Sequence, residues 1–343
     1  MKTAKKWWIL AAVLSVVAGG LLIAGGLAAV RFDWSRLSTV TYSTRTYPVE
    51  DRFTAVSVNT GSHSIRLEPA DDDAASVVCR ESDDDVITVD VQDGVLQITA
   101  QKKARPWYKH ILVDFSGDGD TVLVRLPRQT YARLLLRSSS GNIAVSDGLQ
   151  FQDADITASS GSIAFSAAAA DELTLQTASG DIAVRNTASA AVCASAGSGE
   201  ITLTEVRAGN RLQLSTNSGD ITLENVQISG AAEIIGCSGD IRLQKSSADS
   251  LGIQTASGDV RLENVRIAGP LQLTGTSGDI GLKEIDASTL DIQTTSGDVT
   301  GSLLSRKIFV TKTGSGSVSV PDSVSGGKCS VKTTSGDIRF TFC

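Results

Sequence analysis

The sequence predicts an all-β protein, a parallel β-solenoid (β-helix) of about eleven coils of 19–20 residues, preceded by one N-terminal transmembrane helix. Three observations predict this fold. A Ser-Gly dipeptide recurs eleven times at intervals of 19 or 20 residues, apolar and polar residues alternate around each copy, and a run of 24 uncharged residues lies near the start. Alternation with a period of two is typical of half-buried strands, and self-similarity at a fixed period is typical of repeat architectures.

The first 30 residues predict a membrane location. Residues 1–6 form a basic tail with Lys2, Lys5 and Lys6, and residues 7–30 carry no charge. Because about 20 apolar residues cross a bilayer and basic flanks stay inside, we expect a single-pass anchor in the cell membrane. Its N-terminus would be cytoplasmic and the C-terminal body extracellular. A cleaved signal peptide is the alternative, but its apolar core usually has about 7–15 residues.

Between the anchor and the repeats, the sequence predicts a juxtamembrane stalk at residues 31–50 and an irregular β lead-in at residues 51–133. Apolar and polar residues alternate in the lead-in as they do in strands, but the 19–20-residue repeat is absent from it. We expect it to cap the N-terminal end of the solenoid, whose open sheet edge would otherwise invite aggregation. The acidic runs 71–73 and 83–85 are interpreted as solvated loops, because neither has the alternating spacing of a calcium loop, and a metal site is the alternative. Residues 116–120, which include Asp118 and Asp120, are interpreted as a hairpin tip. The basic, aromatic residues 101–110 are also interpreted as a loop, with binding to anionic lipid or wall polymer as the alternative.

The repeats occupy residues 134–343. Every corner pair is Ser-Gly, and Asp follows the glycine in seven of the eleven copies. Positions −7, −5, +2 and +4 from the glycine are apolar in nearly every copy, so one side of each strand is predicted to be buried. Glycine permits a positive φ that other residues adopt only at a cost of about 1–2 kcal/mol. The eleven glycines are Gly141, Gly161, Gly180, Gly199, Gly219, Gly239, Gly258, Gly278, Gly297, Gly316 and Gly336.

Other β architectures were weighed against the solenoid. Consecutive hairpins with Ser-Gly turns remain an alternative. A membrane barrel needs strands of about 9–11 residues, which is longer than the alternating runs here. A propeller needs four strands in each blade, and its usual motifs are missing. Stacked coils bury like residues against like, which favours a solenoid rod on the order of 50 Å long.

The aspartates that follow the corner glycines form a column with two interpretations. In stacked coils these carboxylates would lie about 4.8 Å apart and repel one another unless something compensates. In the structural interpretation, each carboxylate accepts hydrogen bonds from backbone N–H groups at its own turn. In the functional interpretation, the column binds Ca²⁺, and no other cofactor or metal is predicted. The calcium candidates are Asp220, Asp240, Asp259, Asp279 and Asp298.

The five cysteines are too few and too scattered for a disulfide-built scaffold, and no C-x-x-C motif occurs. Cys329 lies seven residues before the last corner glycine, and Cys343 lies seven residues after it. The two residues would therefore meet at one side of the final coil. This spacing predicts a Cys329–Cys343 disulfide.

The N-terminal anchor, the lead-in ending in VLVRLP (122–127) and the long Ser-Gly-Asp-Ile/Val array resemble a bacterial β-strand-repeat family of unknown function, often labelled "putative adhesin". The likeness covers about residues 50–343. It implies a cell-envelope protein with a β-helical body and no assigned catalytic residues. Copies with Asn142, Ser162, Glu200 or Ser317 depart from the pattern, which weakens the case for a chemistry shared by all the acids.

Composition excludes several classes of function. The net charge of −7 argues against nucleic-acid binding driven by phosphate attraction. Only His63 and His110 occur, so histidine-based zinc sites are nearly excluded and the recurring serines have no histidine in the array to activate them. From residue 134 onward there is no Trp or Tyr, which counts against ordinary carbohydrate recognition by the rod.

The sequence therefore predicts a membrane-anchored, surface-exposed and non-catalytic module, adhesin-like or otherwise interacting at the cell envelope. No catalytic residue is predicted. Contact would be multivalent, along polar side chains at position −4 such as Thr157, Gln176, Gln254 and Gln293. The expected partner is a cell-surface component, a wall polymer or a protein, besides the membrane that holds the N-terminal helix. The alternatives are a cell-wall polysaccharide hydrolase or lyase, and an accessory protein of an envelope-stress signalling system.

Overall fold

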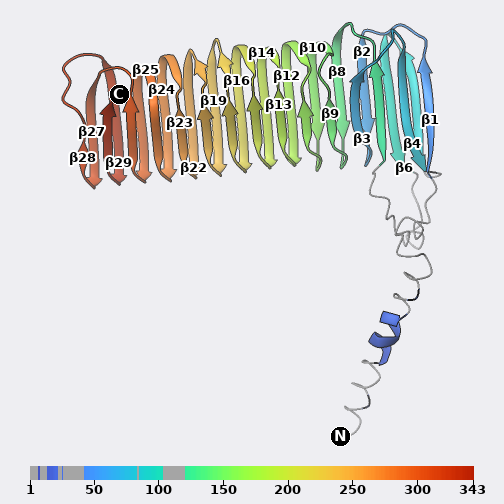
Figure 1. The fold of residues 1–343 in the computed structure, drawn as a ribbon, viewed down its shortest axis with the longest axis horizontal. Helices are drawn as coiled ribbons and strands as arrows, with labels where there is room; N and C mark the ends of the chain where they lie inside the picture. The colour runs from blue at the N-terminus through green and yellow to red at the C-terminus, as the bar shows by residue number, and fades with distance from the viewer. Residues whose placement is uncertain (1–6, 8–13, 22–24, 26–41, 83–84, 103–119) are drawn as a thin grey trace.

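The computed structural model describes residue 7, residues 14–21, residue 25, and residues 42–82, 85–102 and 120–343. Among the described residues from 42 onward, all regular structure is β, and the coils stack along a straight rod (Figure 1). The predicted all-β parallel solenoid is confirmed. Residues 14–21 are helical, but no helix within the described part is long and apolar enough to cross a membrane. Most of the predicted anchor, residues 7–30, lies outside the described residues.

Two sheets enclose the core of the rod. Sheet B contains most of the strands that lead into the Ser-Gly corners, and sheet A contains the strands that follow them. Sheet B consists of β2 (Ala55–Thr60), β5 (Asp85–Gln92), β6 (Val95–Lys102), β8 (Thr130–Ser138), β10 (Gln150–Ala158), β12 (Ala168–Ser179), β14 (Ala188–Ser198), β16 (Arg207–Ser218), β18 (Gln227–Ile228), β19 (Ala231–Ser238), β21 (Ser247–Ala248), β22 (Ser250–Ser257), β24 (Arg266–Ser277), β27 (Lys307–Ser315) and β29 (Gly327–Ser335). Sheet A consists of β1 (Tyr42–Val49), β3 (Ser64–Pro69), β4 (Ala75–Ser82), β7 (Thr121–Leu126), β9 (Ile143–Val145), β11 (Ile163–Phe165), β13 (Ile182–Arg185), β15 (Ile201–Thr204), β17 (Ile221–Glu224), β20 (Ile241–Gln244), β23 (Val260–Glu263), β26 (Val299–Leu303), β28 (Val318–Ser319) and β30 (Ile338–Phe342), while β25 (Ile280–Ser296) bends from sheet A into sheet B.

A single coil shows how the alternating sequence builds the rod. β16 directs Leu212 and Leu214 inward, the chain turns at Gly219, and β17 directs Ile221 and Leu223 inward. All four of these side chains are fully buried, at 0% exposure. Burial of apolar surface is the dominant favourable term in folding. Each coil therefore adds one layer to a continuous core and is covered by the next coil.

Neighbouring coils stack with equivalent repeat positions directly opposite one another. Across sheet A, the residue two places after the corner glycine always pairs with its counterpart in the next coil. A β-branched side chain occupies every one of these positions, which suits a pleated surface, and all of them are buried except Val318 in the outermost coil. The aligned series is Ile143, Ile163, Ile182, Ile201, Ile221, Ile241, Val260, Ile280, Val299, Ile338 and Val318.

The corner glycines lie against the backbone of the adjoining coil. A Cβ added at any of the eleven would lie between 1.9 and 2.4 Å from a carbonyl oxygen of that coil. Gly258 has a φ of +118°, and its Cβ would lie 2.1 Å from the carbonyl oxygen of Gly239. Gly161 does not have a positive φ, yet its Cβ would lie equally close to the carbonyl oxygen of Gly141, at 2.1 Å. Close approach of the coils is therefore the constraint common to all eleven, and the positive φ predicted from the sequence applies to only some of them.

The opposite corner of the coil also takes a left-handed conformation, but without glycine. Asn225 has a φ of +55° and Lys245 a φ of +49°. This conformation costs a non-glycine residue roughly 1–2 kcal/mol, less for Asn, whose side chain can bond locally. The series mixes residue types, so the sequence alone does not predict this second corner. It comprises Asn186, Glu205, Asn225, Lys245, Asn264 and Glu284.

The order of the coils differs from the order of the chain at both ends. The last strands, β29 and β30, lie between the coil of β25 and β26 and the coil of β27 and β28. At the other end, β2 and β3 lie between the coil of β6 and β7 and the coil of β8 and β9. At each end, the outermost parallel coil is therefore not the terminal one in the sequence. At the C-terminal end the outermost coil is β27 and β28, and at the N-terminal end it is β6 and β7.

Antiparallel strands complete the N-terminal end of the rod. β1 pairs with β4, β4 pairs with β7, and β5 pairs with β6. The prediction that residues 31–50 form a stalk is wrong for residues 42–49, which are β1. The reason is that Tyr47 and Val49 pack against the hydrophobic core.

We expect Gly258→Ala to lower the free energy of unfolding by about 1–3 kcal/mol from backbone strain alone, and by more once the clash with Gly239 is included. The matched control is Gly252→Ala in the same coil, where an added Cβ would meet only the Ala232 carbonyl oxygen, at 3.9 Å. That variant should be neutral or slightly stabilising. Urea unfolding followed by circular dichroism measures both. Equal tolerance of the two substitutions would contradict the stacking constraint.

Candidate functional site

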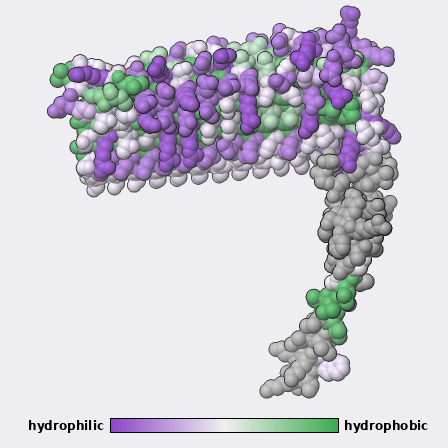
Figure 2. All heavy atoms as spheres, in the orientation of Figure 1, coloured by the Kyte–Doolittle hydropathy of each residue, from purple (hydrophilic) through white to green (hydrophobic). Residues whose placement is uncertain are grey.

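The outer face of sheet B carries a row of side chains four residues before the corner glycines, here called the polar row. Pairing across the sheet places each member directly opposite its counterpart in the next coil. The four residues singled out from the sequence all lie in it. Hydrophilic side chains also dominate the face of the rod visible in Figure 2. The polar row runs Arg137, Thr157, Gln176, Ser195, Ser215, Ile235, Gln254, Thr274, Gln293, Lys332 and Lys312, and Ile235 is its one apolar member.

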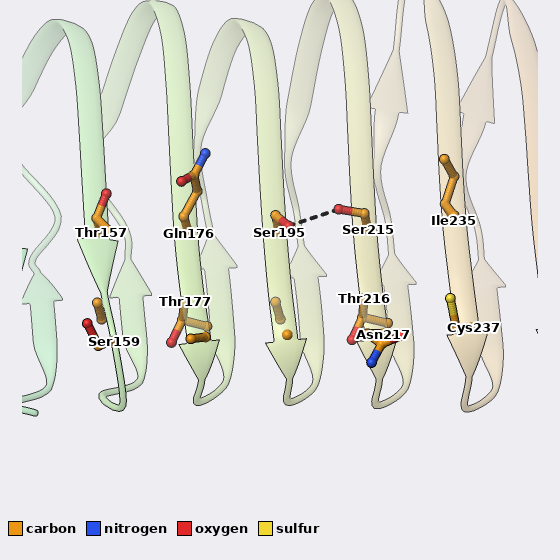
Figure 3. Close-up of a pocket in the computed structure, with 14 residues that line it drawn as sticks. Thr157, Ser159, Gln176, Thr177, Ser195, Ser215, Thr216, Asn217, Ile235 and Cys237 are labelled. Atoms are coloured by element: carbon orange, nitrogen blue, oxygen red, sulfur yellow. Dashed lines mark hydrogen bonds between the residues drawn. The ribbon is translucent and has the colours of Figure 1, made fainter. Parts of the chain in front are cut away.

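Small side chains hollow the middle of this face into an open groove of about 710 Å³. The groove crosses β10, β12, β14, β16 and β19, and its side chains project from adjacent strands in parallel ranks (Figure 3). We call it the sheet B groove. It is lined by Thr157, Ala158, Ser159, Gln176, Thr177, Ala178, Ser195, Ala196, Gly197, Ser215, Thr216, Asn217, Ile235 and Cys237.

The sheet B groove offers hydroxyl and amide groups at the spacing of the strands. The Ser215 hydroxyl donates to the Ser195 hydroxyl over 3.0 Å, which links two neighbouring coils. The described residues that line the groove include no carboxylate, imidazole or amine, and the Cys237 thiol is their one side chain of the kinds that commonly transfer protons. The groove can therefore pack against and hydrogen-bond an extended ligand, and repeated strands would present the same groups about every 4.8 Å.

The aspartates after the corner glycines form a hydrogen-bonded column, here called the Asp ladder. Oδ1 of each aspartate accepts the backbone N–H of the equivalent residue in the next coil, as from Asp240 to Asp220 (2.8 Å) and from Asp259 to Asp240 (2.9 Å). The same bond recurs with Asp279, Asp298 and Asp337 as donors. The structural interpretation predicted from the sequence placed these bonds within each turn, whereas they join successive coils.

Arginines three residues after the glycines neutralise part of the Asp ladder. Arg242 bonds Asp220 over 2.9 Å and also contacts Asp240, and Arg261 bonds Asp259 over 2.6 Å. The Asp240 backbone N–H, and then the Arg242 guanidinium, lower the pKa of Asp220 against the effect of burial. Hydrogen bonds to the charged form favour that form. The repulsion expected within the column is thus offset by backbone amides and, at these coils, by guanidinium groups.

A family profile described as Toastrack DUF4097 matches residues 53–206 and 245–342, more than half of the chain. The chain belongs to this family. The match covers both the irregular lead-in and most of the repeats. Comparison with curated proteins found no match.

Several solved structures are similar to this Toastrack chain over most of their length. A "putative adhesin" from Bacteroides fragilis is 14% identical, with a TM-score of 0.33, covering 88% of this chain and 97% of that one. A "putative lipid binding protein" from Parabacteroides distasonis is 14% identical, with a TM-score of 0.39, covering 89% and 98%. A "putative adhesin" from the same species is 12% identical, with a TM-score of 0.37, covering 87% and 98%.

The cysteines of the Toastrack chain are all free thiols in the structure. Cys329 points into the core opposite Leu290 and Phe309, and burial raises the pKa of its thiol to about 12. Cys343 is exposed beyond the end of β30. The predicted Cys329–Cys343 disulfide is therefore not formed here, because position −7 faces the core of sheet B and position +7 lies outside sheet A.

Other predicted features of the lead-in are only partly described. Residues 83–84 and 103–119 lie outside the described residues, which leaves the basic segment 101–110 and the acidic segment 116–120 mostly without a structural account. The two described ends, Asp85 and Asp120, are not solvated as the predicted loop and hairpin tip would require. Their carboxylates are 0% and 7% exposed, and both approach His63.

The cluster of His63, Asp85 and Asp120 is the feature that sequence reasoning missed. It is the one group of three or more His, Cys, Asp or Glu ligand atoms lying within 4.8 Å of one another among the residues that the structure describes. Its members are separated in sequence by 22 and 35 residues and show no recognisable spacing. Only the pairing of β3 with β7 brings Asp120 and His63 together.

The calcium hypothesis for the Asp ladder is tested by thermal melts in millimolar Ca²⁺ and Mg²⁺. We expect equal melting temperatures, because Oδ1 of each candidate aspartate already accepts a backbone N–H from the next coil. A rise of several degrees specific to Ca²⁺, lost in Asp279→Asn and Asp298→Asn, would assign metal binding to the ladder instead.

The lowered pKa of Asp220 predicts a pH dependence of stability. A carboxyl whose pKa is lower in the folded protein contributes its stability above the ordinary Asp pKa of about 3.9. That contribution is lost as the pH falls below about 4 and through the lowered folded pKa. Asp220→Asn should therefore flatten the fall of the urea midpoint below pH 4, whereas Thr222→Ala in the same coil should leave it unchanged. Parallel curves for Asp220→Asn and the wild type would contradict this assignment.

Proposed function

We propose that this Toastrack chain is a non-catalytic, adhesin-like interaction module of the cell envelope that binds its partner along the polar row and the sheet B groove. The single observation that carries the proposal is the stacking of position −4 side chains into one continuous row across the coils. Such a row offers many equivalent contacts to one extended ligand. Linked contacts raise the overall affinity without any single strong site.

The chemistry of the sheet B groove supports binding over catalysis. Its lining combines hydroxyls, the amides of Gln176 and Asn217, the Cys237 thiol and apolar side chains that are small except for Ile235. A general acid or base would have to lie within about 2.6–3.2 Å of a bound substrate, and the described lining offers only the Cys237 thiol for this role, with no carboxylate, imidazole or amine beside it. The wall-polysaccharide hydrolase or lyase considered from the sequence has no comparable observation in its favour, nor does the stress-signalling accessory.

The proposed location rests on the sequence of residues 1–30. The uncharged run 7–30 after three lysines supports a single-pass anchor in the cell membrane, with the N-terminus in the cytoplasm. The rod would then extend outside the cell. In that setting the proposed partner is a cell-surface component, a wall polymer or a protein that lies along sheet B.

Site-specific photocrosslinking on intact cells tests the proposal. A photoreactive residue at position 215 in β16 faces the groove, and one at position 222 in β17 of the same coil faces outward from sheet A. We expect at least tenfold more crosslinked product from position 215, because the partner lies along sheet B. Lysine substitution of Ser195, which fills the groove, should abolish that product.

Equal crosslinking from positions 215 and 222, or none from either, would overturn the proposed binding face. Release of reducing ends when the protein is incubated with wall polysaccharide would favour the hydrolase or lyase. The Thr222→Lys variant serves as the matched control for added charge. It should leave crosslinking at position 215 at the wild-type level.

A further inference from the structure

We infer that His63, Asp85 and Asp120 form a binding site for a divalent transition metal ion, best suited to Zn²⁺, at the N-terminal end of the rod. The inference is independent of the sheet B groove. It rests on three features of the described residues: where the cluster lies in the corner column, how its polar atoms are buried and left unpaired, and how each carboxylate is held.

The glycine column of the corners ends at this cluster. Ile65 pairs with Ile143 on one side and with Val122 on the other, so His63 and Asp120 occupy the corner-glycine positions of their two coils. The next corner still packs against the carbonyl oxygen of His63, because a Cβ at Gly141 would lie 2.1 Å from that oxygen. Thr60 also donates to that carbonyl, as Thr177 donates to Gly161. The backbone corner is thus retained while glycine is replaced by two potential metal ligands.

The three side chains are buried and converge. Nε2 of His63 lies 3.2 Å from Oδ1 of Asp85 and 3.9 Å from Oδ2 of Asp120, and the side chains are 0%, 0% and 7% exposed. None of Nδ1 and Nε2 of His63, Oδ1 of Asp85 and Oδ1 of Asp120 has a hydrogen-bond partner among the described residues. Buried polar atoms are nearly always paired, so this convergence calls for a further ligand.

Each carboxylate is oriented through one of its oxygens. Oδ2 of Asp85 accepts the backbone N–H of Ser82 over 2.7 Å and its hydroxyl over 2.8 Å. Oδ2 of Asp120 is 2.7 Å from Nζ of Lys102. Among the described residues, the second oxygen of each carboxylate, Oδ1, has no hydrogen-bond partner, and Oδ1 of Asp85 faces Nε2 of His63 at 3.2 Å. Outer contacts of this kind fix the ligands of metal sites, and their loss typically weakens metal binding by about 10–100-fold.

The donor set indicates the kind of ion. One imidazole nitrogen and two carboxylate oxygens match Zn²⁺, which takes His and Asp ligands at about 2.0–2.2 Å and accepts water as a fourth ligand. Imidazole is a poor choice for Ca²⁺ or Mg²⁺, which prefer oxygen ligands. A hydrogen bond from a protonated His63 is the alternative to a metal ion. It would pair Oδ1 of Asp85 but would leave Oδ1 of Asp120 without a partner among the described residues. A single divalent ion would satisfy one atom from each residue.

Metal binding by the full chain tests the inference. The protein is purified without a polyhistidine tag, stripped with a chelator and titrated with Zn²⁺ alone, with bound metal measured by mass spectrometry and affinity by chelator competition. We expect one Zn²⁺ per chain and a melting temperature that rises with the logarithm of free Zn²⁺. His63→Gln and Asp120→Asn should weaken binding at least 100-fold, and Ser82→Ala should weaken it by about 10–100-fold. Substituted Co²⁺ should show visible d–d bands without a thiolate charge-transfer band, which excludes the cysteines as ligands.

Two variants serve as controls. His110→Gln removes the other histidine of the chain, and Asp90→Asn removes an exposed carboxylate of β5, so both should bind Zn²⁺ like the wild type. A wild-type chain that retains no more Zn²⁺ than His63→Gln would overturn the inference. The inference would also be overturned if the free energy of unfolding depended on His63 and on pH but not on Zn²⁺. In that case an ion pair between a protonated His63 and the two carboxylates would account for the cluster. The wild-type titration decides the matter even if a variant fails to fold.

Discussion

The contact between each corner glycine and a carbonyl oxygen of the adjoining coil is the constraint on which the other features depend. A side chain at any of the eleven glycine corners would separate the coils, because even a Cβ would lie within 2.4 Å of backbone oxygen. This constraint ends at the first two coils, where His63 and Asp120 take the position. With glycine at the corner, the strands of sheets A and B come to hydrogen-bonding distance on both sides of it at once. Because each coil then lies directly over the next with equivalent positions aligned, the Asp ladder, the β-branched core and the polar row all form. A sheet edge alone would permit slippage by one residue, which would turn every side chain to the other face.

The Asp ladder shows which property of aspartate the corner requires. Asn142 makes the same bond as the acids, since its Oδ1 accepts the backbone N–H of Ser162 over 2.9 Å. The required element is therefore a short side chain with an acceptor oxygen, and the negative charge is secondary. Where charges do accumulate, Arg242 and Arg261 lie against them. Asn142 and Ser162, two of the departures from Asp, keep this structural role, since the Ser162 hydroxyl accepts the backbone N–H of Asp181 over 3.2 Å.

The sequence predicted the features that repeat, and the features it did not predict are those that break the repeat. The Ser-Gly period and the alternation of apolar residues determine the coil and its core, so the solenoid and the buried series were predictable. The exchange of coil order was not, because Val299 could pair equally well with Val318, the next copy in the chain, or with Ile338 when all coils are alike, and the structure pairs it with Ile338. The second corner mixes Asn, Glu and Lys, which hides a shared backbone conformation. The His63 cluster joins residues from three segments whose proximity depends on that exchanged order.

Exact repetition also limits where distinct chemistry can arise in such a fold. A regular coil presents the same side of each strand to solvent, so the polar row and sheet B groove offer repeated weak contacts. A site with different ligand types needs a place where neighbours differ, and the rod has such a place where the glycine column ends. There His63 takes the position of a corner glycine while Asp120 takes the next, and the antiparallel strand β5 adds Asp85. Repetition of the coil thus produces a face suited to extended recognition, and the end of the repeat produces the specific polar cluster.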